Sequence, residues 1–358
     1  MSNVEVQKPN NYGSSKSGII TKLRAGHGNL TDSEIQAIAC WIDLCIPCYG
    51  TYNEGSEWNA NAERTFEEKE YKRSFYDMLD AYAKKAIAGT LDEGVIEVTY
   101  KNTKNKEYTN SGNGFVILHV PETYANKATV TVKLPEGKKY IAVTLNGRMG
   151  ESIIYVPDGT WTYTFANLTS VYPTTMRGSG AGYINNMIVV RFADEEELSE
   201  ERNLAHNGYD MSTSVGAYPH ATASSVDANN AGNEARNVID GFKVNGGVAT
   251  SKVWPNQCWN PGATATNSWI KIDFGRNVKV NTLDILLKAS STDTHYTDAI
   301  VELSDGTTIA ISLHKTAETM SFDLGGVVTS SITIKGFVEA DATQTAPITE
   351  ISVWGTEA

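Results

Sequence analysis

A change of hydrophobic period at Gly94 constrains the fold of this chain more than any other feature. From there onward, apolar and polar residues alternate in short runs that Gly, Pro, Asn and Asp separate. Trp161, Tyr163 and Phe165, for example, alternate with threonines, which gives a strand with one apolar and one hydroxyl face. Several such runs, with no helical pattern between them, predict β-sandwiches.

Residues 1–90 have a different pattern and predict a small α-helical segment. Thr31 begins a helix there, and Glu34 is spaced to complete a capping box with it. Apolar residues then recur at helical spacing until Pro47, and a second helix is expected from about Asn61 to Ala88.

Two β regions follow this segment. Residues 94–193 predict a central β-sandwich and residues 203–358 a second one. The acidic run Asp194–Glu201 between them is interpreted as a solvated hinge. In the last region strands are expected at Lys279–Val280, Leu283–Leu287, Ala299–Leu303, Thr308–Ser312, Ser331–Lys335 and Glu350–Val353. The fold class expected is therefore mainly β.

Charge and composition exclude several classes of partner. The chain of 358 residues has 30 Lys and Arg against 42 Asp and Glu, a formal charge of -12. Nucleic acid and anionic membranes are not expected as partners, because binding phosphate needs a basic face. No apolar run approaches the roughly 18–20 residues of a transmembrane segment, and the N-terminus has no signal-peptide pattern.

Five pieces of the last region occur in an order typical of one known family. They are Asn203–Ala205, Ala223–Ser225, Ala235–Gly241, Trp269–Gly275 and Glu350–Gly355. With them the region resembles the factor V/VIII C-type (discoidin-like, galactose-binding-like) domains, a family that includes sugar-binding modules of bacterial glycan-processing proteins. The resemblance implies a C-terminal jelly-roll β-sandwich that binds a carbohydrate through its loops.

The same resemblance implies a structural calcium ion beside the Ile-Asp-Gly turn. Asp240 and Glu350 stand at the matching positions, with main-chain oxygen near Asn237 as a further ligand. The family's next segment is replaced here by Phe242–Gly247, so Asn245 is a weaker candidate. Calcium requires six to eight oxygen ligands. The alternative is that Asp240 caps its own turn and Glu350 lies on the surface.

Sugar recognition needs an aromatic face for the C–H side of a pyranose and polar groups for its hydroxyls. Trp254 is the preferred stacking residue and His295 the preferred hydrogen-bonding residue. The alternative for each aromatic residue is packing over one end of the sandwich, and Cys258 is expected to be an inert thiol. The full set of candidates in the predicted loops is Tyr218, His220, Trp254, Trp259, Asp293, His295 and Tyr296.

The N-terminal segment has a fainter resemblance, carried by Ser17–Leu23, Gly26–Gly28 and Leu30–Asp43. It is similar to the tail of a cytochrome-c-like domain, as in proteins like the hydrazine synthase alpha subunit, which implies a missing upstream catalytic domain. Covalent haem is not expected, because Cys45-Ile46-Pro47-Cys48 is followed by Tyr49 rather than by His.

The cysteines of this segment leave three interpretations open. His27, Cys40, Cys45 and Cys48 have the ligand types of a zinc site. Against zinc, two of the cysteines fall on the expected helix and His27 lacks a paired ligand. A Cys45–Cys48 redox pair and plain structural cysteines are the alternatives.

The sequence contains no complete catalytic constellation. It has no Gly-x-Ser-x-Gly elbow, no His-Glu-x-x-His and no Walker loop. The expectation is therefore a non-catalytic carbohydrate-binding protein, secreted or of the cell envelope, with a glycan as its partner. The alternatives are a C-terminal accessory part of a larger redox or hydrolytic enzyme, and a protein–protein adhesion module.

Overall fold

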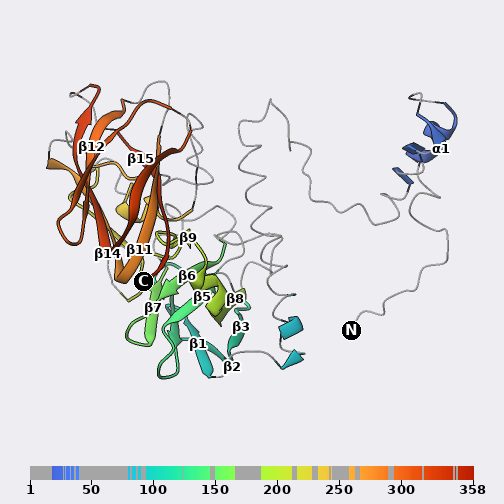
Figure 1. Ribbon diagram of the computed structural model, residues 1–358. Coiled ribbons are helices and arrows are strands. Elements are labelled where there is room, and N and C mark those ends of the chain that lie inside the picture. Colours follow the sequence, from blue (N-terminus) through green and yellow to red (C-terminus); the bar gives the residue numbers. More distant parts are fainter. Residues whose placement is uncertain are drawn as a thin grey trace. The chain divides into compact units, whose positions relative to one another are not determined.

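The structure is a computed structural model, and its strands gather in two groups along the chain (Figure 1). It divides into two compact units, residues 1–66 and 67–358. It describes residues 18–26, 28, 30–32, 34–35, 38–39, 80, 83–85, 88–89, 94–122, 124–145, 150–165, 187–211, 216–227, 233–241, 243, 258–262, 267–288, 294–316, 318–341, 343 and 346–358.

The first unit contains helix α1, Gly18–Arg24. The capping box expected at Thr31 is confirmed: its amide donates to the Glu34 carboxylate at 2.7 Å, and the Glu34 amide donates to the Thr31 hydroxyl at 3.4 Å. His27, the three N-terminal cysteines and most of the helix expected over 61–88 lie outside the described residues. Among the helices that are described, none has the length and apolar character to cross a membrane.

The central region consists of two four-stranded antiparallel sheets, which confirms the expected β architecture. One sheet has the order β2-β1-β4-β7 and the other β3-β8-β5-β6. Their strands are β1 Val95–Lys101, β2 Glu107–Asn113, β3 Phe115–His119, β4 Thr129–Lys133, β5 Tyr140–Thr144, β6 Ser152–Tyr155, β7 Thr160–Thr164 and β8 Met187–Phe192.

Alternating burial in these strands follows the alternation of the sequence. In β7 the two aromatic residues Trp161 and Tyr163 are buried, and the three threonines are exposed. Tyr163 packs edge-on against Phe165, with ring centroids 5.2 Å apart. The central core also takes in Tyr209 and Met211, which follow β8 in the chain.

The C-terminal region is built on two long antiparallel strands, β11 Trp269–Leu287 and β14 Met320–Glu339. Their pairing shifts register between Asp273 and Val278, next to Gly275 (φ 66°). The remaining strands are β9 Arg202–Asn203, β10 His220–Ala223, β12 Tyr296–Leu303, β13 Thr308–Ser312 and β15 Ile348–Glu357.

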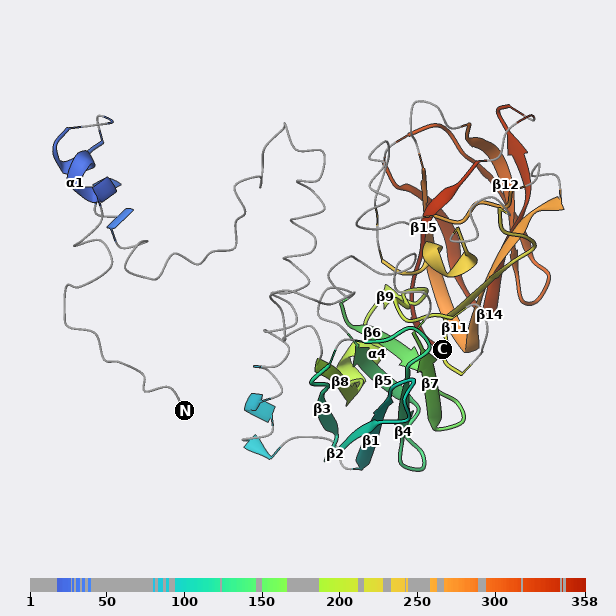
Figure 2. The ribbon, with the colours of Figure 1, turned by 180° about the vertical axis from the view of Figure 1, so that it is seen from behind.

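These strands form one sheet in the order β13-β12-β14-β11-β15-β9, with β10 paired to β11. The two strands expected at Lys279–Val280 and Leu283–Leu287 are therefore parts of one bulged strand. The short 3-10 helix η3, Ala235–Val238, contributes Val238 to the core that the sheet encloses. Figure 2 shows η3 in yellow among the orange and red strands.

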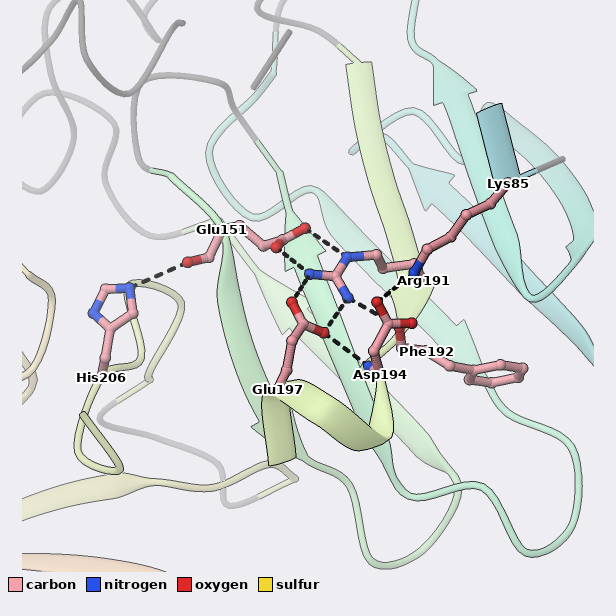
Figure 3. A network of polar contacts seen from close by, with 7 residues as sticks. All are labelled: Lys85, Glu151, Arg191, Phe192, Asp194, Glu197 and His206. Carbon is pink, nitrogen blue, oxygen red and sulfur yellow. Dashed lines mark hydrogen bonds and ion pairs between the residues drawn. The ribbon is translucent and has the colours of Figure 1, made fainter. Parts of the chain in front are cut away.

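The acidic run after β8 is solvated, as the sequence predicted, but it forms a helix with ion pairs to the central region rather than a free hinge. Asp194 caps helix α4, Glu195–Ser199, in a capping box with Glu197. Glu197 also bonds the buried guanidinium of Arg191 at 2.6 Å, and Glu151 bonds the same guanidinium at 2.5 Å (Figure 3). A buried cation needs such partners because an unpaired charge is costly away from water, so the run is anchored to the central sheet.

Candidate functional site

Four segments of the C-terminal region meet at one place, which we call the rim: residues 258–262, 294–296, 339–341 and 346–348. Trp259 and Ile348 exchange two main-chain hydrogen bonds, of 2.8 and 2.9 Å. The Ala340 amide donates to the His295 carbonyl at 2.9 Å. Since strands β12, β14 and β15 begin or end here, the loops between them start from a common, hydrogen-bonded base.

An aromatic floor of Trp259, Phe337 and Tyr296 lies inside the rim. The ring centroids are 6.0 Å apart between Trp259 and Phe337, and 4.4 Å apart between Tyr296 and Phe337. All three rings are buried, and the Trp259 indole donates to the Ser225 carbonyl at 2.9 Å. Burial, with the Glu339 charge nearby, raises the pKa of Tyr296, so its hydroxyl stays protonated.

Two of the residues expected to contact a sugar are therefore core residues. Trp259 and Tyr296 each have 0% of their surface exposed, so neither ring can stack on a ligand. The physical reason is the pairing of Trp259 with Ile348 and the packing of the Trp259 and Tyr296 rings against Phe337. For Trp259 and Tyr296 the prediction was wrong, and packing at the sandwich end was the correct alternative.

His220 and Tyr218 contact residues outside the rim. His220 Nδ1 lies 2.8 Å from Asp210 Oδ1, and both side chains are buried. Burial opposes the charged imidazole, but the hydrogen bond and charge of Asp210 outweigh it and raise the pKa of His220. Tyr218 is half-buried and lies over Gly275, next to Tyr155 of the central region.

His295 is the described candidate that stays at the rim with a half-buried side chain. It directly precedes β12, and its carbonyl is used in the rim's hydrogen bonding. Trp254, Asp293 and Asn245 lie outside the described residues. In the sequence, Trp254 precedes Trp259 by five positions and Asp293 precedes His295 by two.

Two of the residues expected to hold a cation, Asp240 and Glu350, lie near each other at the start of β15. Glu350 is 2% exposed, and one of its oxygens, Oε1, accepts the Gly241 amide at 3.2 Å. The other, Oε2, is buried with no hydrogen-bond partner in the described structure. Burial, followed by the charge of Asp240, raises the pKa of Glu350 well above its usual range, although the positive charge of Lys243 opposes this shift.

This arrangement fits a cation, since a buried carboxylate with a free oxygen next to a second carboxylate is what a positive ion would satisfy. Asn237 contributes differently from the expectation: its side-chain amide donates to the Cys258 carbonyl at 3.1 Å, which ties η3 to the rim. Within the described ranges no group of three or more His, Cys, Asp or Glu side chains forms a metal site. Main-chain oxygens of the turn would therefore have to complete the shell.

Phe337 and His206 are the structural neighbours of these sites that sequence reasoning missed. Phe337 follows Gly336, whose positive φ of 62° interrupts the alternation of β14. The sequence signal that could have identified Phe337 was an aromatic residue directly after a glycine near the end of a strand. His206 packs against Gly241, where a β-carbon would lie 2.7 Å from the ring, and no local sequence pattern indicates this long-range contact.

Comparisons with known proteins match the C-terminal region. A family described as "Domain of unknown function (DUF7402)" matches residues 215–354. No curated protein matches the chain.

Solved structures of similar proteins include carbohydrate-binding modules and a lectin domain. A fucose-binding module from Streptococcus pneumoniae, SpX-3, is 18% identical, with 44% of this chain and 99% of that chain covered and a TM-score of 0.31. The family 32 module of C. perfringens NanJ, in complex with galactose, is 17% identical, with coverages of 37% and 91% and a TM-score of 0.30. The lectin domain of Lectinolysin, in a complex with Lewis b, is 14% identical, with coverages of 44% and 99% and a TM-score of 0.32.

Proposed function

We propose that the protein is a non-catalytic carbohydrate-binding protein whose C-terminal sandwich holds a sugar at the rim. The observation that carries this proposal is the convergence of the rim segments on the buried aromatic floor. Ligand sites are commonly built on loops that a rigid scaffold positions. The resemblance to discoidin-like sugar-binding modules gives the ligand class, and a secreted or envelope location belongs to the same proposal.

Recognition in this proposal divides between an aromatic face and polar groups. Trp254 stacks on the C–H face of the sugar, while His295 and Asp293 bond its hydroxyls. Trp259 and Tyr296 act indirectly, because they hold the base of the loops that carry these residues. A single shallow site gives weak affinity, and multivalent display increases the apparent affinity.

A glycan array, followed by calorimetric titration of the best sugar, tests the sugar site. We expect Trp254→Ala to abolish binding while the melting temperature stays unchanged. Trp269→Ala is the matched control, because Trp269 is 36% exposed while its neighbour Ile270 faces the core. Absence of binding to any glycan, or an equal loss in the two variants, would contradict the proposal.

We also propose that Asp240 and Glu350 hold a divalent cation, of which calcium fits the oxygen ligands best. The unpartnered, buried Glu350 Oε2 supports this site. Calorimetric titration with Ca²⁺ should give binding to the wild type and none to Glu350→Gln. Glu318→Gln, at an exposed position, should bind like the wild type. Equal heats from the wild type and both variants would contradict the site.

A further inference from the structure

One short segment, residues 203–211, belongs to both β regions of the chain. At its start, Asn203 pairs with Trp354 of β15, and the Leu204 amide donates to the Val353 carbonyl at 2.7 Å. At its end, Tyr209 is buried in the central core and donates its hydroxyl hydrogen to the Gly150 carbonyl at 2.6 Å. Movement of one sandwich against the other would therefore have to break contacts of this segment.

His206 stands in the middle of the segment and contacts both sides. Its Nε2 lies 3.3 Å from the Glu151 carbonyl of the central region (Figure 3). The same atom lies 3.3 Å from the hydroxyl of Ser152, also in the central region. The Ser152 hydroxyl also accepts the Gly208 amide at 3.0 Å. On its other side the ring lies directly on Gly241, at a distance that leaves no room for a β-carbon.

The ring of His206 packs against the turn that carries the proposed cation site. Gly241 follows Asp240 directly, and its amide donates to Glu350 at 3.2 Å. The next residue of the segment is tied to the same turn, because the Asn207 amide donates to the Ile239 carbonyl at 2.8 Å. The turn at 239–241 thus contacts both Glu350 of β15 and the segment 206–207.

We propose that a divalent cation bound by Asp240 and Glu350 locks the central sandwich onto the C-terminal one through Gly241 and His206. Without a cation, a Glu350 charge that is buried beside Asp240 is unfavourable even with Lys243 nearby, and the closed turn carries this cost. A cation that binds the closed turn and not the open one stabilises the closed turn by a free energy that depends on this difference in affinity. Every contact that requires the closed turn is stabilised with it. The inference rests on the cation site proposed above and adds a mechanical role to it.

Hydrogen exchange of the full chain, with saturating Ca²⁺ and with a chelator, tests this linkage. At a free Ca²⁺ concentration of about 100 times Kd, amides that exchange only through the open turn should exchange up to about 100-fold more slowly. We expect this protection at residues 237–241 and 348–352, and also across the junction at residues 150–156 and 203–211. The distant hairpin of β12 and β13 should change little.

Two variants separate the linkage from the binding of the cation. His206→Ala should still bind Ca²⁺ in calorimetric titration, but protection should no longer extend to residues 150–156. Ser152→Ala removes a smaller group from the same contact and serves if His206→Ala does not fold. It should reduce the protection at 150–156 as well.

The outcomes distinguish the two proposals. Binding of Ca²⁺ with protection confined to 237–241 and 348–352 would overturn the linkage and leave the cation site standing. Protection at 150–156 that persists unchanged in either variant would overturn it too. Absence of any Ca²⁺ binding in calorimetry would overturn the cation site, and with it this inference.

Discussion

The contact between Gly275 and Tyr218 shows how a long-range contact can require glycine at one position. Its φ of 66° lies in the left-handed region, and a β-carbon there would be 2.3 Å from the Tyr218 ring. Gly325 has a similar φ of 74°, but nothing lies within 4 Å of its β-carbon position. Alanine substitutions at the two glycines therefore distinguish the cost of backbone strain from the cost of crowding against a neighbouring ring.

We expect Gly325→Ala to cost about 1 kcal/mol, the strain of a left-handed residue with a side chain. Gly275→Ala should cost about 1–3 kcal/mol more, because the added methyl group must displace the Tyr218 ring. Urea denaturation of both variants measures the difference. Equal losses of stability would contradict the close contact between Tyr218 and Gly275.

The His220–Asp210 pair gives a prediction for pH. The pKa of His220 is raised in the folded protein above its ordinary value of 6.5. A raised folded-state pKa means that the pair contributes its full stability below the unfolded pKa and loses it as the pH rises through the folded pKa. The melting temperature of His220→Gln should therefore approach that of the wild type as the pH rises above the ordinary histidine pKa of 6.5. A difference in melting temperature between the two proteins that does not change with pH would contradict this role of the pair.

At the scale of elements, helix α4 is held by ions rather than by apolar packing. None of its residues is buried, but Glu197 shares the buried Arg191 with Glu151. Burial raises the pKa of Glu151 even so, whereas bonding to Arg191 outweighs burial and lowers the pKa of Glu197. The guanidinium of Arg191 is therefore the main anchor of α4 on the central sheet.

Arg191→Met should cost about 3 kcal/mol, near the lower end for breaking a buried ion pair, since the two carboxylates remain 26% and 33% exposed. The control is Lys133→Met, which breaks an ion pair with Glu97 whose side chains are 60% and 43% exposed. It should cost less than about 1 kcal/mol. Denaturation of the two variants compares them, and a loss as small for Arg191→Met as for the control would contradict the anchoring role.

Sequence patterns predicted the elements whose signal is local. The alternation in β7 and the capping box at Thr31 were both read correctly. The Asp194-x-x-Glu197 spacing was also a capping signal, but the run's acidity obscured it, and its partner Arg191 is revealed only by the fold. Trp259 looked like a loop residue because its pairing with Ile348, 89 positions later, leaves no trace in the neighbouring sequence.

At the scale of the whole molecule, the two sandwiches share residues 203–211 and should unfold together. Tyr209 accepts the Leu145 amide at 3.1 Å and donates to Gly150, so Tyr209→Phe leaves two buried main-chain groups unpaired. We expect a loss of about 1–3 kcal/mol. Calorimetry should show one transition that shifts as a unit. Two separate transitions, of which only one moves, would contradict the shared core.

The central claim is that the rim of the C-terminal sandwich binds a sugar, and saturation-transfer NMR on the full chain tests it most directly. Galactose-, fucose- and glucosamine-type sugars would be measured with the wild type and with Trp254→Ala. The account predicts transfer to the ring C–H protons of at least one sugar in the wild type, and its loss in the variant at an unchanged melting temperature. No transfer to any sugar, or equal transfer in both proteins, would contradict it.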